Sequence, residues 1–134
     1  MSRKTVREAV VTALTNSGRF QRVYDGAARS VDGQSPVAVV LSLGTATEDL
    51  TRGRRGGART HTLGISIYIG CASGQEADAE DALDEIVQAT ITDLHAAGYG
   101  VPGTDAGSDL TPLYSIDGAP YRGERIRATI EEYD

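Results

Sequence analysis

Residues 60–71, THTLGISIYIGC, decide the fold, because this stretch has the clearest alternation of apolar and polar positions in the chain. A period of two residues puts successive side chains on opposite faces of a β-strand. One face carries His61, Leu63, Ile65, Ile67 and Ile69, and the other carries Thr60, Thr62, Gly64, Ser66 and Tyr68. A strand with one apolar face is typical of a sheet that is covered on that side only.

Further strands are expected on both sides of this stretch. Residues 35–43, SPVAVVLSL, alternate in the same way. Pro36 comes at the first strand position, where a missing N–H is tolerated. Val37, Val39, Leu41 and Leu43 share one face, and Ala38, Val40 and Ser42 share the other. Residues 45–51 and 60–71 predict two strands joined by segment 52–59, and residues 122–133 predict the last strand, with Ile126, Ala128 and Ile130 facing inward.

Two amphipathic helices flank these strands. Residues 5–17 have an apolar stripe at helical spacing, and Gly18 suits the stop after the last turn. Residues 74–97 have a second stripe, and Gly98 ends it. The first stripe is Val6, Ala9, Val10, Ala13 and Leu14; the second is Ala79, Leu83, Ile86, Val87, Ile91 and Leu94. The forms Thr-x-x-Glu at residues 5–8 and Ser-x-x-Glu at 73–76 predict capping boxes, and Ser2 is an alternative cap of the first helix.

The order of these elements predicts an α+β fold: an antiparallel or mixed β-sheet with two helices packed on one face. A short extended piece, 22–24, precedes an Asp25-Gly26 turn, and the Gly-, Pro- and Asp-rich stretch 99–117 is expected to be a loop. With 134 residues, we expect one domain, 1–134. A single cysteine, Cys71, excludes an internal disulfide framework.

Charge is distributed unevenly along the chain. The net charge is −6, yet residues 1–75 carry ten Lys and Arg against five acidic residues, whereas residues 76–134 carry three Arg against fourteen acidic residues. An acidic balance argues against a general nucleic-acid binder. The split suits a subunit that sets a basic patch against an acidic patch of its neighbour, and it also fits a solvated surface with uneven charge. The longest apolar run, residues 37–41, is too short for a membrane span, and a signal peptide is not expected, so we expect a cytoplasmic protein.

Candidate chemical groups in the sequence are few. His61 and His95 lie on different elements without the spacing of a metal site or triad, and His61 is expected at the sheet rim. Cys71 is interpreted as a small buried or rim residue. Segment 52–59, RGRRGGAR, lacks the order of a phosphate-binding loop and joins two strands. It is either a solvated hairpin tip or an arm that binds an acidic partner, and four arginines in eight residues favour the arm.

Several packing segments together carry a resemblance. They are VREAVVTAL (6–14), VYDG (23–26), SPVAVVL (35–41), ISIYI (65–69) and a final strand ending in EEY (131–133). In order and spacing, over nearly the full length, the chain resembles the bacteriophage tail terminators, the lambda-type minor tail proteins that cap the finished tail tube. The resemblance implies a structural virion protein, not an enzyme, without a cofactor, metal or catalytic residue.

The resemblance also implies partners. Such proteins form a hexameric ring on the last ring of tail-tube subunits, stop polymerisation and present the surface that joins the head–tail connector. They are assembled in the host cytoplasm and remain in the virion tail. DNA passes through the ring without specific binding, and no membrane is involved. Because phosphate contacts would hold DNA, we expect acidic residues to line the lumen. The expected partner-binding residues are Arg52, Arg54, Arg55 and Arg59, and the expected lumen residues are Asp105, Asp109 and Asp117.

Two other functions stay open at this stage. One is a head–tail connector or tail-completion protein of the same assembly, which has a similar size and class. The other is a small enzyme or ligand-binding domain, which should have a concave pocket with converging polar groups.

Overall fold

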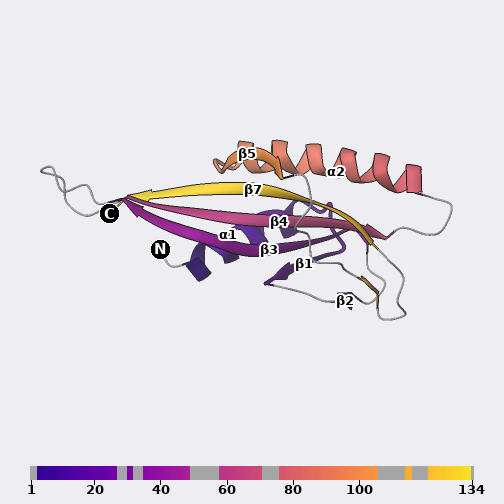
Figure 1. Ribbon diagram of the computed structural model, residues 1–134, viewed down its shortest axis with the longest axis horizontal. Coiled ribbons are helices and arrows are strands. Elements are labelled where there is room, and N and C mark those ends of the chain that lie inside the picture. Colours follow the sequence, from indigo (N-terminus) through magenta and orange to yellow (C-terminus); the bar gives the residue numbers. More distant parts are fainter. Residues whose placement is uncertain are drawn as a thin grey trace, which may run out of the picture.

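A five-stranded sheet and two helices make up most of the described chain (Figure 1). The computed structural model describes residues 3–26, 30–31, 35–48, 58–70, 76–105, 114–115 and 121–133. The helices are α1 (Arg3–Asn16) and α2 (Glu76–Ala96). The strands are β1 (Arg22–Asp25), β2 (Ser30–Val31), β3 (Val37–Glu48), β4 (Ala58–Gly70), β5 (Gly100–Asp105), β6 (Tyr114–Ser115) and β7 (Tyr121–Tyr133).

The main sheet has the strand order β1-β3-β4-β7-β5. β1 runs parallel to β3, and the other neighbours are antiparallel. β2 and β6 form a separate two-stranded parallel pair. A mixed sheet flanked by two helices is the α+β architecture that the sequence predicts, so this prediction is confirmed.

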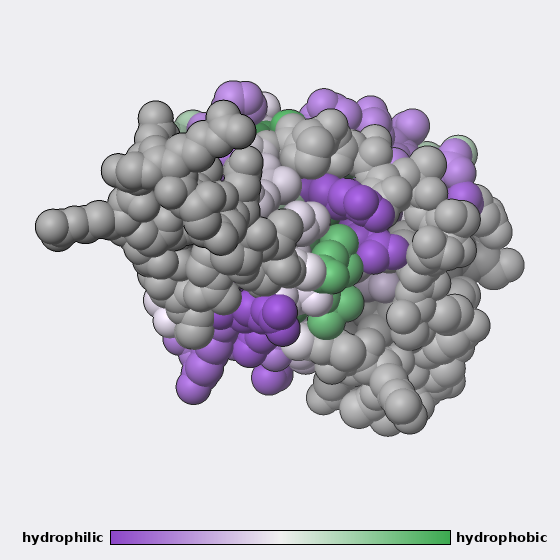
Figure 2. Space-filling model, turned by 60° about the vertical axis from the view of Figure 1, so that its left-hand side comes forward, coloured by the Kyte–Doolittle hydropathy of each residue, from purple (hydrophilic) through white to green (hydrophobic). Residues whose placement is uncertain are grey.

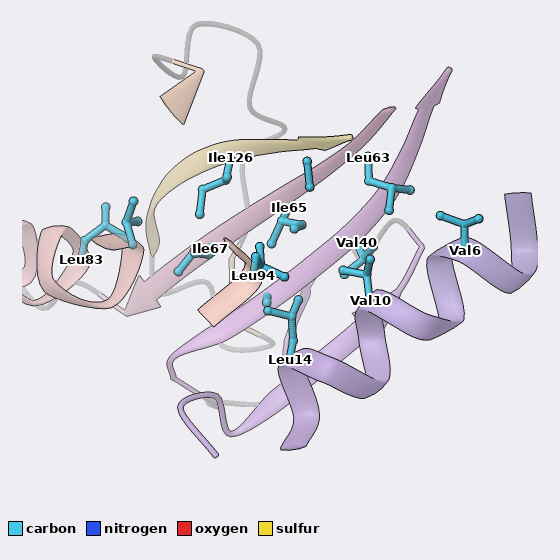
Figure 3. Packing of buried hydrophobic residues seen from close by; sticks show 13 residues of the cluster. Val6, Val10, Leu14, Val40, Leu63, Ile65, Ile67, Leu83, Leu94 and Ile126 are labelled. Carbon is cyan, nitrogen blue, oxygen red and sulfur yellow. The ribbon is translucent and has the colours of Figure 1, made fainter. Parts of the chain in front are cut away.

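Both helices pack on the same face of the sheet, which we call the inner face (Figure 3). Side chains from α1, α2 and the three long strands meet there in one cluster. The cluster consists of Val6, Val10, Leu14, Ala38, Val40, Leu63, Ile65, Ile67, Leu83, Val87, Leu94, Ile126 and Ala128. Full burial of one such large side chain stabilises the fold by about 1.5–3 kcal/mol. The predicted stripes of both helices are therefore confirmed in their buried members.

The helix ends agree with the sequence to within two residues. α1 begins at Arg3 instead of Thr5, and both helices are followed by a glycine in the left-handed region, Gly18 at φ 72° and Gly98 at φ 92°. A left-handed residue closes the last turn, and glycine adopts it without a steric penalty. The predicted cap at Thr5 is wrong, because α1 begins at Arg3 and Thr5 lies inside its first turn. The predicted cap at residues 73–76 begins outside the described residues.

The expected break between strands at residues 43–45 is wrong. β3 runs without interruption from Val37 to Glu48, and its register against β4 shifts between Ser42 and Gly44. Such a bulge adds one residue to a strand and bends it without ending it. The Gly44 that suggests a strand end in the sequence therefore lies at a bulge inside one long strand.

The expected loop at 99–117 is also wrong where the structure describes it. Residues 100–105 form β5, which pairs with β7, and residues 114–115 form β6. Glycine and proline weaken the strand signal in the sequence, but β5 lies at the sheet edge, where Pro102 costs least. The register of β5 shifts between Gly100 and Gly103.

The sheet face opposite the helices, which we call the outer face, is not bare. Val37, Val39 and Tyr68 are buried there, with Tyr24, Leu41 and Tyr121 packed against them. The expectation of a sheet covered on one side only is therefore wrong. The Tyr68 ring crosses Gly123 on β7, where an added Cβ would lie 2.5 Å from the Tyr68 Cδ1 atom. The glycine thus provides the space that the ring occupies.

The predicted position of His61 is also wrong. The sequence predicts it at the sheet rim, but its side chain is only 1% exposed. It shares the inner face with Leu63 and pairs in register with Thr45 and Ile130. The buried face of β4 therefore extends toward the N-terminus of the strand past Leu63, its first apolar residue on that face.

Candidate functional site

The end of the sheet where β3 leads to β4, which we call the hairpin end, is the first part of the site. Here Glu48 pairs with Ala58, and Ala58 pairs with Tyr133. Figure 1 shows the ends of β3, β4 and β7 extending past both helices. The connection 49–57 leaves the sheet and returns to it at this end, so the basic segment is attached to the part of the sheet farthest from α2's first turns.

The predicted partner-binding arginines are only partly within the described chain. Arg52, Arg54 and Arg55 lie outside it, whereas Arg59 belongs to β4 and pairs in register with Thr47 and Glu132. The structure therefore locates Glu48 and Ala58, the residues on either side of the connection 49–57.

The predicted lumen residues are similarly divided. Asp109 and Asp117 lie outside the described residues. Asp105 is the last residue of β5, in register with Arg125 of β7. The structure therefore sets one of the three beside an arginine position on the sheet.

The edge of β3 at the hairpin end is a feature that sequence reasoning missed. β1 pairs only with Val37–Val40, and β3 continues for eight more residues, 41–48. Within the described residues, no strand pairs with β3 on that side beyond Val40. The sequence contains one signal for this edge: the predicted extended piece at 22–24 is much shorter than the strand that follows Pro36, so it can pair with only part of that strand.

The exposed side of α2 is strongly acidic. Asp78, Glu80, Asp81, Asp84 and Glu85 are all exposed. Asp84 and Glu80 border a cavity of about 280 Å³ between α2 and the first residues of β7. Its other lining residues are Leu83, Arg122, Gly123 and Glu124. The Arg122 Nη2 atom lies 2.6 Å from the Glu80 Oε1 atom, so one carboxylate there is neutralised.

A second ion pair fastens α2 to the loop after α1. The Arg19 Nε atom lies 2.6 Å from the Asp93 Oδ2 atom, and the Arg19 Nη2 atom lies 3.4 Å from Oδ1. This hydrogen bond and the charge of Asp93 raise the pKa of Arg19 above its usual value. Arg7 and Asp25 form a similar pair between α1 and the end of β1. These pairs position the helices and leave the acidic face of α2 exposed.

The outer face combines apolar and charged side chains. Leu43 is the exposed large hydrophobic residue of the described chain, at 38% exposure. A Cβ added at Gly64 would meet Leu43 and Arg125 side-chain carbons at 3.0–3.2 Å, so both side chains lie over this glycine. Figure 2 shows a small hydrophobic patch bordered by hydrophilic side chains, seen from the hairpin side of the molecule. Burial raises the pKa of Tyr68 above its ordinary value, and the Ser66 hydrogen bond and the Arg125 charge oppose that rise.

The residues with catalytic potential are not arranged as a site within the described chain. His61 is buried, whereas His95 is exposed in the last turn of α2. In the described residues, no group of three or more His, Cys, Asp or Glu is close enough together to hold a metal ion. No described helix is long and apolar enough to cross a membrane. Cys71 lies outside the described residues.

Comparison with known proteins does not assign the chain to a family. No protein-family model matches it, and no curated protein matches it in sequence.

Proposed function

We propose that this protein is a phage tail terminator: a ring of about six copies that caps the tail tube, stops its polymerisation and forms the surface for head–tail joining. Its partners are then other copies of itself, the tail-tube protein and the head–tail connector. DNA passes through the ring. The proposal rests on the resemblance of the packing segments and on one observation about charge.

That observation is the separation of the basic segment from the acidic helix face. Segment 49–57 is attached at Glu48 and Ala58, whereas the cavity beside α2 lies at Arg122–Glu124, which pair with Ile67–Ile69 of β4. At the rise of a β-strand, Ala58 and Ile67 are about 30 Å apart. A nine-residue connection held at both ends reaches only about 15 Å. An extended arginine side chain adds roughly 7 Å to the reach of this backbone, so the arginines of one copy cannot reach the acidic face of the same copy.

Opposite charges that cannot meet within one chain suit contacts with other chains. In a ring whose copies are not shifted along the strands, a neighbour's acidic helix face is about as far from the arginines as that of the same copy. The arginines therefore suit acidic groups on the tube, since a guanidinium can bind a carboxylate with two parallel hydrogen bonds.

The lumen is a further part of the proposal. DNA has to slide through the ring, and every fixed phosphate contact would add salt-dependent affinity. We expect acidic residues, with Asp105, Asp109 and Asp117 as candidates, to face the bore. A bore lined by arginines in an assembled tail would contradict this part of the proposal.

The experiment is tube growth in the presence of the purified protein. Tail-tube subunits are polymerised with and without it, and tube lengths and ends are measured by electron microscopy. We expect shorter tubes of uniform length with a ring at one end. Tubes of unchanged length without an added ring would contradict the proposed function.

A triple variant tests the role of the arginines in capping. Arg52, Arg54 and Arg55 are changed together to Glu, and the matched control changes them to Lys, which keeps the charge. Because no described core residue changes, the melting temperature should stay nearly the same. We expect the Glu variant to leave tails overlong, and the wild-type interaction to weaken as salt rises. Normal tail lengths with the Glu variant at physiological salt would mean that the segment is a solvated tip.

A further inference from the structure

The open edge of β3 has the properties of a strand-pairing site. Residues 41–48, LSLGTATE, contain no Pro, Lys or Arg; of the features that protect an edge strand, the stretch has a bulge near its start and one charged residue at its end, Glu48, and Thr45–Thr47 has neither. A strand edge in this state presents backbone N–H and C=O groups to any extended segment that reaches it. The bulge between Ser42 and Gly44 lies near the start of the open stretch, so Thr45–Glu48 continues regularly beyond it.

The backbone groups that point to the open side can be identified from the hydrogen bonds to β1. The Gly26 N–H donates to the Val40 carbonyl at 2.9 Å. The backbone N–H and C=O groups of Val40 therefore point to β1, and those of Leu41 point to β4. Leu41 pairs with Gly64, and Gly44 pairs with Thr62.

The two β4 partners, Gly64 and Thr62, are two residues apart, so both direct their backbone groups toward β3. The backbone groups of Gly44, like those of Leu41, therefore point to β4. It follows that Thr45 and Thr47 direct their N–H and C=O groups away from β4, to the open side.

On the opposite side of the hairpin end, β7 also extends beyond its neighbouring strand, β5. The last pair between β5 and β7 is Gly100 with Thr129, and β7 continues for four more residues, Ile130–Tyr133. These four residues pair with Ala58–His61, the same part of β4 that pairs with Thr45–Glu48. The four residues of β7 therefore lie at the same end of the sheet as Thr45–Glu48, which are the last four of the eight residues on the β3 edge.

The directions of the two strands also match. β3 and β7 are each antiparallel to β4, so they run parallel to each other. A rotation about an axis parallel to the strands carries one copy into the place of its neighbour and brings β7 of the first copy beside β3 of the second with this direction kept. The contact joins two different edges, so it is head-to-tail, and it closes into a ring when the rotation is a whole fraction of a turn.

We propose that residues Ile130–Tyr133 of a second copy of this chain add to the β3 edge at Thr45–Glu48 as a parallel strand. This inference rests on the proposed function, because it names the contact through which the ring closes. The hairpin ends of all copies then form one continuous sheet around the ring, and the arginine segments project from it side by side.

Proline substitution tests the N–H groups on the open side of β3 separately from the N–H groups that point to β4. Thr47→Pro removes an N–H that points to the open side and no hydrogen bond to β4, whereas Thr47→Ala keeps the N–H. Ala46→Pro removes an N–H that faces β4 and serves as the control for damage to the monomer. We expect Thr47→Pro to keep the wild-type melting temperature and to weaken ring formation at least about tenfold, while Thr47→Ala forms rings normally. Ring formation with Thr47→Pro at the wild-type concentration would overturn the inference.

Cross-linking identifies the occupant of the edge. Two single-cysteine proteins, Thr47→Cys and Glu132→Cys, are prepared with Cys71→Ser, and one of them carries a mass tag. They are mixed and treated with a short bismaleimide under conditions of ring or cap formation. We expect cross-linked pairs that contain one protein of each kind. Pairs formed by Thr47→Cys with itself, or cross-links only to the tube subunit, would overturn the inference.

The two proposals fail in different ways. If the wild-type protein caps tubes but Thr47→Pro also caps them and the mixed cross-link is missing, the edge contact is wrong and the function stands. If the wild-type protein forms rings with the mixed cross-link but does not affect tube growth, the function is wrong and the edge contact stands.

Discussion

The two ends of the long sheet differ in what covers them. At one end, which we call the covered end, Val40, Ile65 and Ile126 lie under both helices, and Tyr68 closes the outer face. At the hairpin end, β3, β4 and β7 extend past the helices, and one side of β3 has no strand partner within the described residues. Within the described residues, the covered end therefore supplies most of the buried apolar contacts that stabilise the monomer.

The largest expected effect is a difference in the free energy of unfolding between two alanine variants, one at each end of the sheet. Ile65→Ala removes a fully buried side chain from the centre of the cluster and should lower the free energy of unfolding by about 2–5 kcal/mol. Leu43→Ala, at 38% exposure near the start of the open edge, should lower it by less than about 1 kcal/mol. Urea unfolding followed by circular dichroism measures both. Equal losses would show that the two ends of the sheet contribute equally to the stability of the monomer.

The next effect concerns the two glycines of the outer face. Gly123→Ala puts a Cβ 2.5 Å from the Tyr68 ring, which packs against buried valines and cannot easily move, so we expect a loss of about 1–3 kcal/mol. Gly64→Ala meets only the ends of Leu43 and Arg125 side chains, which are flexible, so its loss should be smaller. Urea unfolding of the two variants side by side checks the order. A larger loss for Gly64→Ala would show that the middle of the outer face is the more rigidly packed part.

A smaller effect comes from the pH dependence of Tyr68. Burial raises the pKa of this phenol in the folded state, whereas in the unfolded chain it is about 10. The folded protein therefore binds the proton more tightly, and the free energy of unfolding should fall as pH rises above about 10. Tyr68→Phe removes this group and should make the decline less steep. Urea unfolding between about pH 9 and pH 11 compares the two proteins. Identical slopes would mean that Tyr68 is not protected from ionisation.

The smallest effect is expected from the Arg19–Asp93 pair. Both side chains are exposed to solvent, and exposed ion pairs contribute little to stability. Arg19→Ala should leave the melting temperature within the error of measurement, and added salt should remove any remaining difference from the wild type. A clear loss of stability at high salt would show that the pair fastens α2 more strongly than solvent screening allows.

The sequence predicts the covered end well, because burial on one face leaves a regular pattern. The stripe of Val6, Val10 and Leu14 and the alternation of Leu63, Ile65 and Ile67 both follow from contact with a single core. This pattern is sufficient for the α+β class and for the helix boundaries to within about two residues. It does not reveal the outer cluster, where Tyr68 depends on a glycine that is 55 positions away in the chain.

The hairpin end is harder to predict from sequence. Gly44 has the same appearance in a sequence whether a strand ends or bulges there, and only the pairing with β4 distinguishes the two cases. Pro102 and its neighbouring glycines hide β5 for a similar reason, since edge strands tolerate residues that a central strand does not. An open edge depends on where the neighbouring strand stops. For β3 that is the last residue of β1, Asp25, which is far from residues 41–48 in the chain.

The proposed function is tested most directly by electron microscopy of tail tubes assembled with the purified protein. We predict averaged images with a ring of about six subunits on one tube end, in which the hairpin ends of neighbouring copies are in contact. Tube ends without a ring of this subunit would contradict the proposed function.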